Sequence, residues 1–306
     1  MNSLQSPSAV VMVRPHAFAS NPETRDDNAF QTLANRSAKA TSAAARDEHD
    51  RAVEQLHAAG VTVHVFDDHG TQDTPDSVFP NNWFSTHPGG HVAIYPMFVP
   101  SRRRERRSDV IELLKQEYRV QDVIDYSGLE QDNLALEGTG AMVLDHVGRI
   151  AYTVKSNRAD RVLLERFCTH FNYEPIAFEA RDAEGRDVYH TNVLMGIGMH
   201  YVLICLDMIT DLDRRATVRA RLEESGRTVI DLSHEQIADF AGNAIELSGN
   251  NGLVLALSSR ALDALTPQQI EVIKASATTL SLTIPTIETA GGSVRCMIAG
   301  IHLSRR

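Results

Sequence analysis

Three side chains that lie far apart in the sequence could together perform nucleophilic catalysis. Cys296 stands in GGSVRCMIAGIHL, where a glycine pair permits close backbone approach and an accessible thiol. His190 stands in DVYHTNVLM, at a change from polar to apolar residues, and Glu137 precedes a GTG run in LALEGTGAMVL. A cysteine thiolate is reactive near neutral pH when a cation or a proton acceptor lies beside it. A Cys–His pair is assembled in space, so the chain separation is no obstacle.

Taken singly, each of these residues has an ordinary explanation. A cysteine among apolar residues is more often inert core, a histidine more often a surface or capping residue, and a glutamate beside GTG more often a solvated loop residue. Cys168 and Cys205 are interpreted as structural. Three distant cysteines favour a reducing cytoplasm and predict neither a disulfide framework nor a zinc site. The short GTG run is wrongly spaced for a dinucleotide-binding loop.

An internal repeat suggests how the three residues could meet. Five segments share a polar start, a glycine or asparagine turn and apolar runs on either side of it, as in a β-hairpin. They are Asn82 to Met97, Gly140 to Val154, Thr191 to Leu206, Asn243 to Leu257 and Gly292 to Leu303. Their starts lie 49 to 58 residues apart. Glu137, His190 and Cys296 stand at or near three of these starts.

Helices and single strands are predicted between the hairpins. Apolar residues spaced by three and four predict helices over 38–59, 103–117, 158–171, 212–225 and 266–277. Single strands are predicted at 61–66, 175–180, 228–233 and 282–287. The unit is therefore hairpin, helix, strand. Five such ββαβ units around a central channel would form one α/β propeller domain over residues 1–306; the alternative is an ordinary α/β sandwich with coincidental spacing.

Composition narrows the classes of partner. The chain has 306 residues, of which 42% are hydrophobic, and a formal charge of −10. A net acidic protein is a poor candidate for binding nucleic acid or an anionic membrane through its overall field. The chain contains neither a run of about 18 apolar residues nor a segment typical of a signal peptide, so we expect a cytoplasmic protein. A cationic or zwitterionic small molecule is the expected partner.

Ordered motifs resemble the amidinotransferase, or guanidino-group-modifying, superfamily. PDSVF at 75–79, LEGTGAMV, a single histidine before a strand and the C-terminal GGSVRCM occur in that order over nearly the whole chain. Within the superfamily, NPET at 21–24, FPNNW at 79–83 and SGNN at 248–251 resemble the citrulline hydrolase branch. The resemblance implies a five-fold α/β propeller and a hydrolase that acts on a C–N bond without a metal or other cofactor.

The resemblance also implies roles. Cys296 would be the nucleophile, His190 the general acid and base, and Glu137 the group that orients or binds the reacting nitrogen end. Asp76 would bind the substrate side chain. Arg158 would hold an α-carboxylate, unless it forms a helix-surface salt bridge. A second carboxylate-binding candidate is Arg102 or its neighbour Arg103, although their run suits a solvated helix start.

Asn82 departs from the pattern of relatives that hydrolyse guanidines, in which this position is a carboxylate. A carboxylate only accepts hydrogen bonds, whereas an amide also donates and could meet a carbonyl oxygen. We therefore expect a neutral ureido substrate, with citrulline converted to ornithine, ammonia and carbon dioxide. The alternatives are an arginine deiminase, a dimethylarginine hydrolase, an amidino transferase and a non-catalytic propeller such as a ribosome anti-association factor. The sequence permits a homo-oligomer without specifying one.

Overall fold

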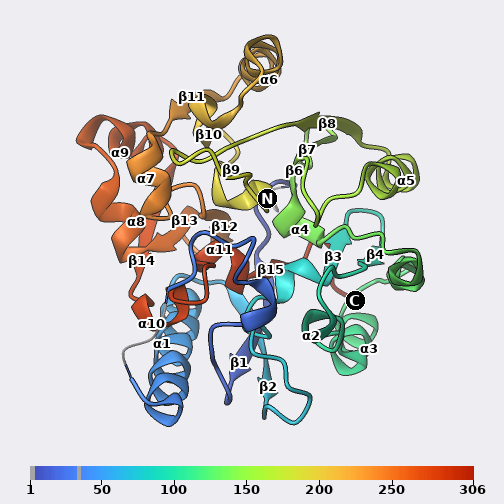
Figure 1. Cartoon of the computed structure of the whole chain (residues 1–306). Coiled ribbons are helices and arrows are strands. Elements are labelled where there is room, and N and C mark those ends of the chain that lie inside the picture. Colours follow the sequence, from blue (N-terminus) through green and yellow to red (C-terminus); the bar gives the residue numbers. More distant parts are fainter. Residues whose placement is uncertain (1–3, 33–35) are drawn as a thin grey trace.

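Five small sheets of identical strand arrangement dominate the computed structural model, which describes residues 4–32 and 36–306. Within these residues the sheets have the orders β15-β1-β2, β3-β4-β5, β6-β7-β8, β9-β10-β11 and β12-β13-β14. In each sheet the middle strand is antiparallel to one neighbour and parallel to the other. Figure 1 shows the helices largely outside the sheets, while α4 and α11 lie near the centre.

The strands are β1 (Ala9–Pro15), β2 (Thr62–Asp68), β3 (Phe84–His87), β4 (His91–Ile94), β5 (Asp122–Asp125), β6 (Met142–Asp145), β7 (Ile150–Val154), β8 (Glu174–Phe178), β9 (Met195–Ile197), β10 (Tyr201–Ile204), β11 (Thr228–Asp231), β12 (Ile245–Gly249), β13 (Gly252–Ser258), β14 (Ala277–Leu282) and β15 (Ala299–Gly300). The α-helices are α1 (Ala38–Ala58), α2 (Pro100–Arg103), α3 (Ser108–Glu117), α4 (Gly138–Ala141), α5 (Arg161–Phe171), α6 (Leu212–Glu224), α7 (His234–Ala238), α8 (Ser259–Ala264), α9 (Pro267–Lys274), α10 (Pro285–Glu288) and α11 (Val294–Met297). Short 3₁₀ turns include η2 (Pro80–Asn82) and η4 (Thr191–Val193).

The second to fourth hairpins and helices show how the predicted repeat is built. In the second hairpin, β6 and β7 pair antiparallel with Met142 opposite Thr153. Helix α5 then returns the chain, and β8 joins β7 in parallel with Glu174 opposite Ile150. An antiparallel pair needs just a tight turn, whereas a parallel partner needs a crossover. The hairpin–helix–strand order predicted from hydrophobic periodicity is therefore present in these units.

The fifth predicted hairpin, Gly292 to Leu303, does not form within its own segment. Most of its first half is helix α11, and its strand β15 spans two residues. β15 pairs antiparallel with β1, with Val10 opposite Gly300. The C-terminal segment therefore completes a sheet begun by the N-terminal one. A two-residue strand has no period of its own, which explains why local sequence misplaced its partner.

Two further boundaries differ from the prediction. The strand expected at 282–287 lies earlier, as β14 (Ala277–Leu282), and Pro285 stands at the first position of α10. Proline suits the first helical turn and cannot donate to a sheet. The helix expected over 103–117 begins later, as α3 at Ser108, because Arg107 is extended (φ −123°) and stands at its N-cap; Arg103 ends the separate short helix α2.

Helix α1 illustrates how the core forms. Its N-cap residue Ser37 accepts a hydrogen bond from the Ala40 N–H at 3.4 Å. The helix buries Ala45, Ala52 and Leu56, which lie in one cluster with apolar residues of β1. Small residues let the helix lie close to the sheet, so this face removes apolar area from water. Among the described residues, no helix combines the length and apolarity that crossing a bilayer requires.

A buried histidine of α1 predicts acid sensitivity. His49 is fully buried, and neither ring nitrogen has a hydrogen-bond partner among the described residues. Burial lowers the pKa of His49 to about 4, despite the opposing charge of Asp50. The unfolded chain binds this proton below about pH 6.5, so stability is lost as pH falls from there toward 4. His49→Leu should reduce the loss of unfolding free energy between pH 7 and pH 5 by about 2 kcal/mol.

Urea unfolding of both proteins at the two pH values measures this difference. The matched control is His57→Leu, on the exposed face of the same helix, where no imidazole is withdrawn from water. It should keep the wild-type pH dependence. An equal pH dependence in wild type and His49→Leu would contradict the assignment of this acid sensitivity to His49.

Candidate active site

Six of the seven predicted site residues line one small cavity near the centre of the molecule. They are Asp76, Asn82, Arg102, Arg158, His190 and Cys296. The seventh, Glu137, is fully buried and contacts His190. Asn82 ends η2, Glu137 and His190 directly precede α4 and η4, and Cys296 lies in α11. Arg102, in α2, and Arg158, between β7 and α5, do not lie at unit starts. The structure therefore brings together side chains separated by up to 220 residues of chain, from Asp76 to Cys296.

Cys296 lies in the short helix α11 and is 3% exposed. Its Sγ atom accepts hydrogen bonds from Asn192 Nδ2 and Asn243 Nδ2, both at 3.3 Å. These two N–H donors fix the position of the sulfur, the atom that would act as the nucleophile. Asn243 is itself held in place, because its Oδ1 accepts a hydrogen bond from the Ser293 N–H at 3.2 Å. The thiol is thus oriented by amides of two other units.

His190 and Glu137 form a buried pair. His190 Nε2 lies 2.8 Å from Glu137 Oε2, and the side chains are 2% and 0% exposed. Burial lowers the pKa of His190 to about 4, against the opposing effect of the Glu137 carboxylate. Burial alone would raise the pKa of Glu137, but Arg158 and the hydrogen bond with His190 hold it well below its usual range. The resting imidazole is therefore neutral at pH 7 and can accept a proton beside a permanent anion.

Arg158 is buried between two carboxylates and is not a surface residue. Its Nε donates to Asp27 Oδ2 at 3.0 Å, its Nη2 donates to Asp27 Oδ1, and its Nη1 lies 3.5 Å from Glu137 Oε2. The guanidinium also lies over the Tyr189 ring, 4.8 Å from the ring centre. The Asp27 carboxylate thus takes the bidentate contact that a substrate carboxylate would make with this arginine.

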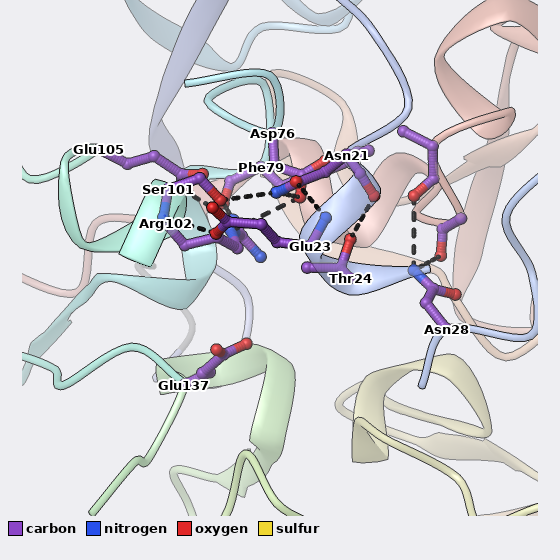
Figure 2. A network of polar contacts seen from close by, with 12 residues as sticks. Asn21, Glu23, Thr24, Asn28, Asp76, Phe79, Ser101, Arg102, Glu105 and Glu137 are labelled. Carbon is purple, nitrogen blue, oxygen red and sulfur yellow. Dashed lines mark hydrogen bonds and ion pairs between the residues drawn. The ribbon is translucent and has the colours of Figure 1, made fainter. Parts of the chain in front are cut away.

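Asp76 belongs to a polar network that Figure 2 shows around Asn21, Ser101 and Arg102. Its Oδ2 accepts a hydrogen bond from Asn21 Nδ2 at 2.9 Å, and the same Nδ2 donates to Ser101 Oγ at 2.9 Å. Asp76 Oδ1 is buried and has no hydrogen-bond partner among the described residues. Burial raises the pKa of Asp76, although the nearby Arg102 charge acts in the opposite direction. An N–H donor that entered the cavity would relieve this unpaired acceptor.

Arg102 is buried, whereas the sequence also allowed it to lie in a solvated helix start. It is 2% exposed, and its guanidinium makes two hydrogen bonds of 2.9 Å to Glu105 and one of 3.1 Å to the Phe79 carbonyl. The buried Glu105 carboxyl has its pKa raised to about 7 by desolvation, despite Arg102. Arg103, by contrast, is partly exposed and donates to the Met97 and Phe98 carbonyls. Of the two arginines, Arg102 therefore lies in the cavity wall.

Asn82 and His190 both pack against Gly140 of α4. A Cβ atom at Gly140 would lie 2.2 Å from Asn82 Oδ1 and 2.9 Å from His190 Nδ1. Gly140→Ala should therefore displace both side chains and lower kcat about 100-fold, the cost of a misplacement of about 1 Å. Steady-state kinetics with the active substrate measures this effect. Gly128→Ala is the matched control, since no atom lies within 4 Å of a Cβ there; equal activity of the two variants would contradict the prediction.

The cavity is too small to hold an amino acid as it stands. Its volume is about 20 Å³, close to the space of a single water molecule. Thr24 and Asn28, from the segment between β1 and α1, form part of its wall. Asn28 Nδ2 contacts the Ala290 and Gly291 carbonyls at 3.4 and 3.5 Å, which are long hydrogen bonds. Substrate entry therefore requires part of this wall to move.

Sequence reasoning missed three polar contributors: Asn192, Asn243 and Asp27. Asn192 and Asn243 stand at the third and fourth repeat starts, the same signal that selected His190. Asp27 has no comparable signal, because it reaches Arg158 across 131 residues of chain. Among residues 4–32 and 36–306, no three or more His, Cys, Asp or Glu side chains are placed to hold a metal ion.

A family model described as eukaryotic N,N dimethylarginine dimethylhydrolase matches residues 14–303. The chain belongs to this family. The family lies in the guanidino-group-modifying branch of the amidinotransferase superfamily, so the resemblance inferred from the motifs is confirmed at that level. No curated protein matches the chain by sequence. The description of the family names dimethylarginine and not citrulline as the substrate.

Solved structures establish the same fold. The N-terminal domain of ArgZ, an arginine dihydrolase from the ornithine-ammonia cycle in Cyanobacteria, was solved with substrate bound; it matches with TM-score 0.72 and 16% identity over 96% of this chain and 99% of that domain. A dimethylarginine dimethylaminohydrolase variant in an adduct with S-methyl-L-thiocitrulline matches with TM-score 0.61 and 14% identity over 98% and 100%. The chain spans 40% of full-length ArgZ.

Proposed function

We propose that the chain is a cysteine hydrolase that cleaves a C–N bond of the guanidino group of arginine or a methylated arginine. The observation that carries this proposal is one cavity lined by Cys296, His190 and a buried aspartate with an unpaired oxygen. The family to which the chain belongs supports the same substrate class. This reading replaces citrulline as the first expectation, because the similar proteins act on guanidino compounds according to their descriptions.

Asp76 supplies the electrostatic argument for a guanidinium. Its Oδ1 atom is an acceptor that lacks a hydrogen-bond partner among the described residues. A guanidinium offers N–H donors alone and carries a positive charge, so it satisfies this acceptor and favours the ionised carboxylate. Burial now opposes ionisation of Asp76. Binding a cation beside it would lower its pKa, and the substrate would gain a charge-assisted hydrogen bond.

The geometry supports a two-step mechanism. Neutral His190 takes the proton of the Cys296 thiol as the sulfur attacks the guanidino carbon. The imidazolium then gives this proton to the departing amine, which leaves a covalent thio-intermediate. His190 then takes a proton from a water molecule that attacks the same carbon, and the C–S bond breaks to return the thiolate and release a ureido product. Glu137 stabilises the imidazolium when His190 carries the proton, through their 2.8 Å contact.

Asn82 favours a second candidate, hydrolysis of a ureido group. Asn82 lines the cavity, and its Oδ1 faces Gly140. The other end of the amide is a donor that could meet the oxygen of citrulline. Cys296 would attack the ureido carbon, His190 would protonate departing ammonia, and the carbamate formed after hydrolysis would lose carbon dioxide to leave ornithine. A site that performs both reactions would convert arginine to ornithine.

Product analysis with arginine, asymmetric dimethylarginine and citrulline side by side tests the proposal. Turnover of arginine releases ammonia and forms citrulline or ornithine, whereas dimethylarginine releases dimethylamine. Turnover of citrulline alone would support the ureido candidate against the guanidino one. A protein that folds but transforms none of the three compounds would overturn both. An added amine that receives the amidino group would identify a transferase.

We also propose that residues 1–306 form one domain in which the five sheets close a ring around a central channel. The identical strand order of the sheets supports this arrangement, as does the pairing of β15 near the C-terminus with β1 near the N-terminus. In such a ring the unit starts face the channel, which accounts for their meeting at one cavity. Self-association and a cytoplasmic location stay predictions.

A further inference from the structure

A second cavity adjoins the loops that carry the candidate site. Its volume is about 50 Å³, and its wall includes Thr139, Ala244 and Arg295. Ala244 directly follows Asn243, which donates to the thiol, and Arg295 directly precedes Cys296. Neither Ala244 nor Arg295 lines the first cavity. We call this second space the rear cavity. It is large enough for a small ion or one to two water molecules and too small for an amino acid.

Arg295 in the rear cavity is a guanidinium without a carboxylate partner. Its Nη1 donates to the Ile298 carbonyl at 2.9 Å, and no ion pair of Arg295 is found among the described residues. Residues 1–3 and 33–35 contain no Asp or Glu, so they cannot supply a side-chain carboxylate. By contrast, the buried Arg102, Arg158 and Arg227 each pair with a carboxylate.

The surroundings of Arg295 disfavour the charged form of its guanidinium group. Burial lowers the pKa of Arg295 to about 10, although the neighbouring Cys296 thiol acts in the opposite direction. Arg295 is half-buried, and a cation partly withdrawn from water without a counter-charge is less stable than a paired one. A negatively charged ligand in the adjoining cavity would stabilise the charged form.

Two imidazoles lie in the same wall, and His146 is the donor of the two. His302 Nδ1 lies 3.1 Å from the Leu4 carbonyl and donates to it, so Nε2 of the neutral His302 ring is an acceptor. The rings of His146 and His302 lie 3.9 Å apart between their centres, and both residues line the rear cavity. His146 Nδ1 lies 2.8 Å from the Tyr173 hydroxyl, which can donate to it and leave Nε2 as an N–H donor. Burial, followed by the Arg295 charge, lowers the pKa of His302 to about 4. An anion beside these groups would stabilise additional positive charge.

One carboxylate limits the charge of the ligand. Glu246 also lines the rear cavity, where its Oε1 accepts hydrogen bonds from Ser6 Oγ at 2.6 Å and from the Met199 N–H at 2.8 Å. Glu246 forms no ion pair with Arg295 among the described contacts. Its negative charge would repel a divalent anion more than a monovalent one.

We propose that the rear cavity binds one small monovalent inorganic anion, of the chloride or bicarbonate class, through Arg295 together with His146. Because Arg295 immediately precedes Cys296 on α11, the bound anion anchors the helix that carries the thiol. This proposal does not depend on the identity of the substrate, since it concerns binding and stability and has its own readout.

Thermal unfolding in gluconate buffer, with chloride or bicarbonate added at constant ionic strength, tests the proposal. At a tenfold excess over the dissociation constant, the wild-type unfolding temperature should rise by about 3 °C with at least one of the two anions. The separate titrations show which anion binds. Arg295→Met should abolish the response, whereas Arg161→Met, an exposed arginine, should retain it. No saturable rise in wild type, an equal rise in Arg295→Met, or an equal rise with sulfate would overturn the proposal.

Bromide provides a measurement that needs no variant. Crystals of the wild-type protein grown in bromide should show an anomalous diffraction peak beside the Arg295 guanidinium in the rear cavity. If chloride raises the unfolding temperature, a structure without a peak there would overturn the proposal even if Arg295→Met fails to fold.

Discussion

The Cys296→Ala variant is expected to release neither ammonia nor dimethylamine above the uncatalysed background, a loss on the order of 10⁴-fold or more in kcat. The thiol is the one atom in the described cavity wall that can form the covalent thio-intermediate. Its sulfur accepts hydrogen bonds from two side-chain amides at 3.3 Å, and alanine leaves those two donors without this acceptor. Ammonia and amine assays on arginine and dimethylarginine measure the loss.

The other two cysteines serve as matched controls for this variant. Cys168 in α5 and Cys205 after β10 are buried, and burial raises the pKa of their thiols to about 12 and about 11. Their alanine variants lose some packing but should keep wild-type kcat. Intact-mass measurement during turnover should detect a covalent adduct on wild type and not on Cys296→Ala. Full activity of Cys296→Ala would end the mechanism proposed above.

Replacing Glu137 with glutamine is expected to lower kcat by about 10²- to 10⁴-fold. The substitution keeps the size of the side chain but removes the anion 2.8 Å from His190 Nε2. The imidazolium that forms during proton transfer then lacks its counter-charge in a buried site, which raises the barrier. Glu137 also accepts a hydrogen bond from the Phe98 N–H at 3.0 Å, so glutamine must satisfy that donor as well.

The effect of Glu137→Gln should fall on kcat more than on KM, because the charge acts mainly when His190 is protonated. Glu48→Gln is a matched control. Glu48 is also buried, accepts hydrogen bonds from the Thr286 and Ile287 N–H groups and does not line the cavity. It should lower stability and preserve kcat. Equal kcat in Glu137→Gln and wild type would exclude a role for this charge in proton transfer.

The sequence predicted the repeating elements well where local rules decide them. Helix α1 was expected over 38–59 and spans Ala38–Ala58, because Ser37 caps its start and Gly60 follows its end. The hairpins of β6–β7 and β9–β10 lie where turn residues separate two apolar runs. The predicted boundaries of elements were wrong where strand pairing is non-local, as with β15, or where a proline starts a short helix, as in α10.

For the site, the sequence alone determined which chemical groups were available, namely Asp76, Glu137, His190 and Cys296, and their order along the repeat. Tertiary structure decided how these groups are partnered. It placed Asn192 and Asn243 on the sulfur, Asp27 on Arg158, and a neutral His190 beside an ionised Glu137. The physical reason is that periodicity reports the local environment of each segment. Hydrogen bonds across 53 to 131 residues, and the desolvation that shifts a pKa, exist only after the units have packed together.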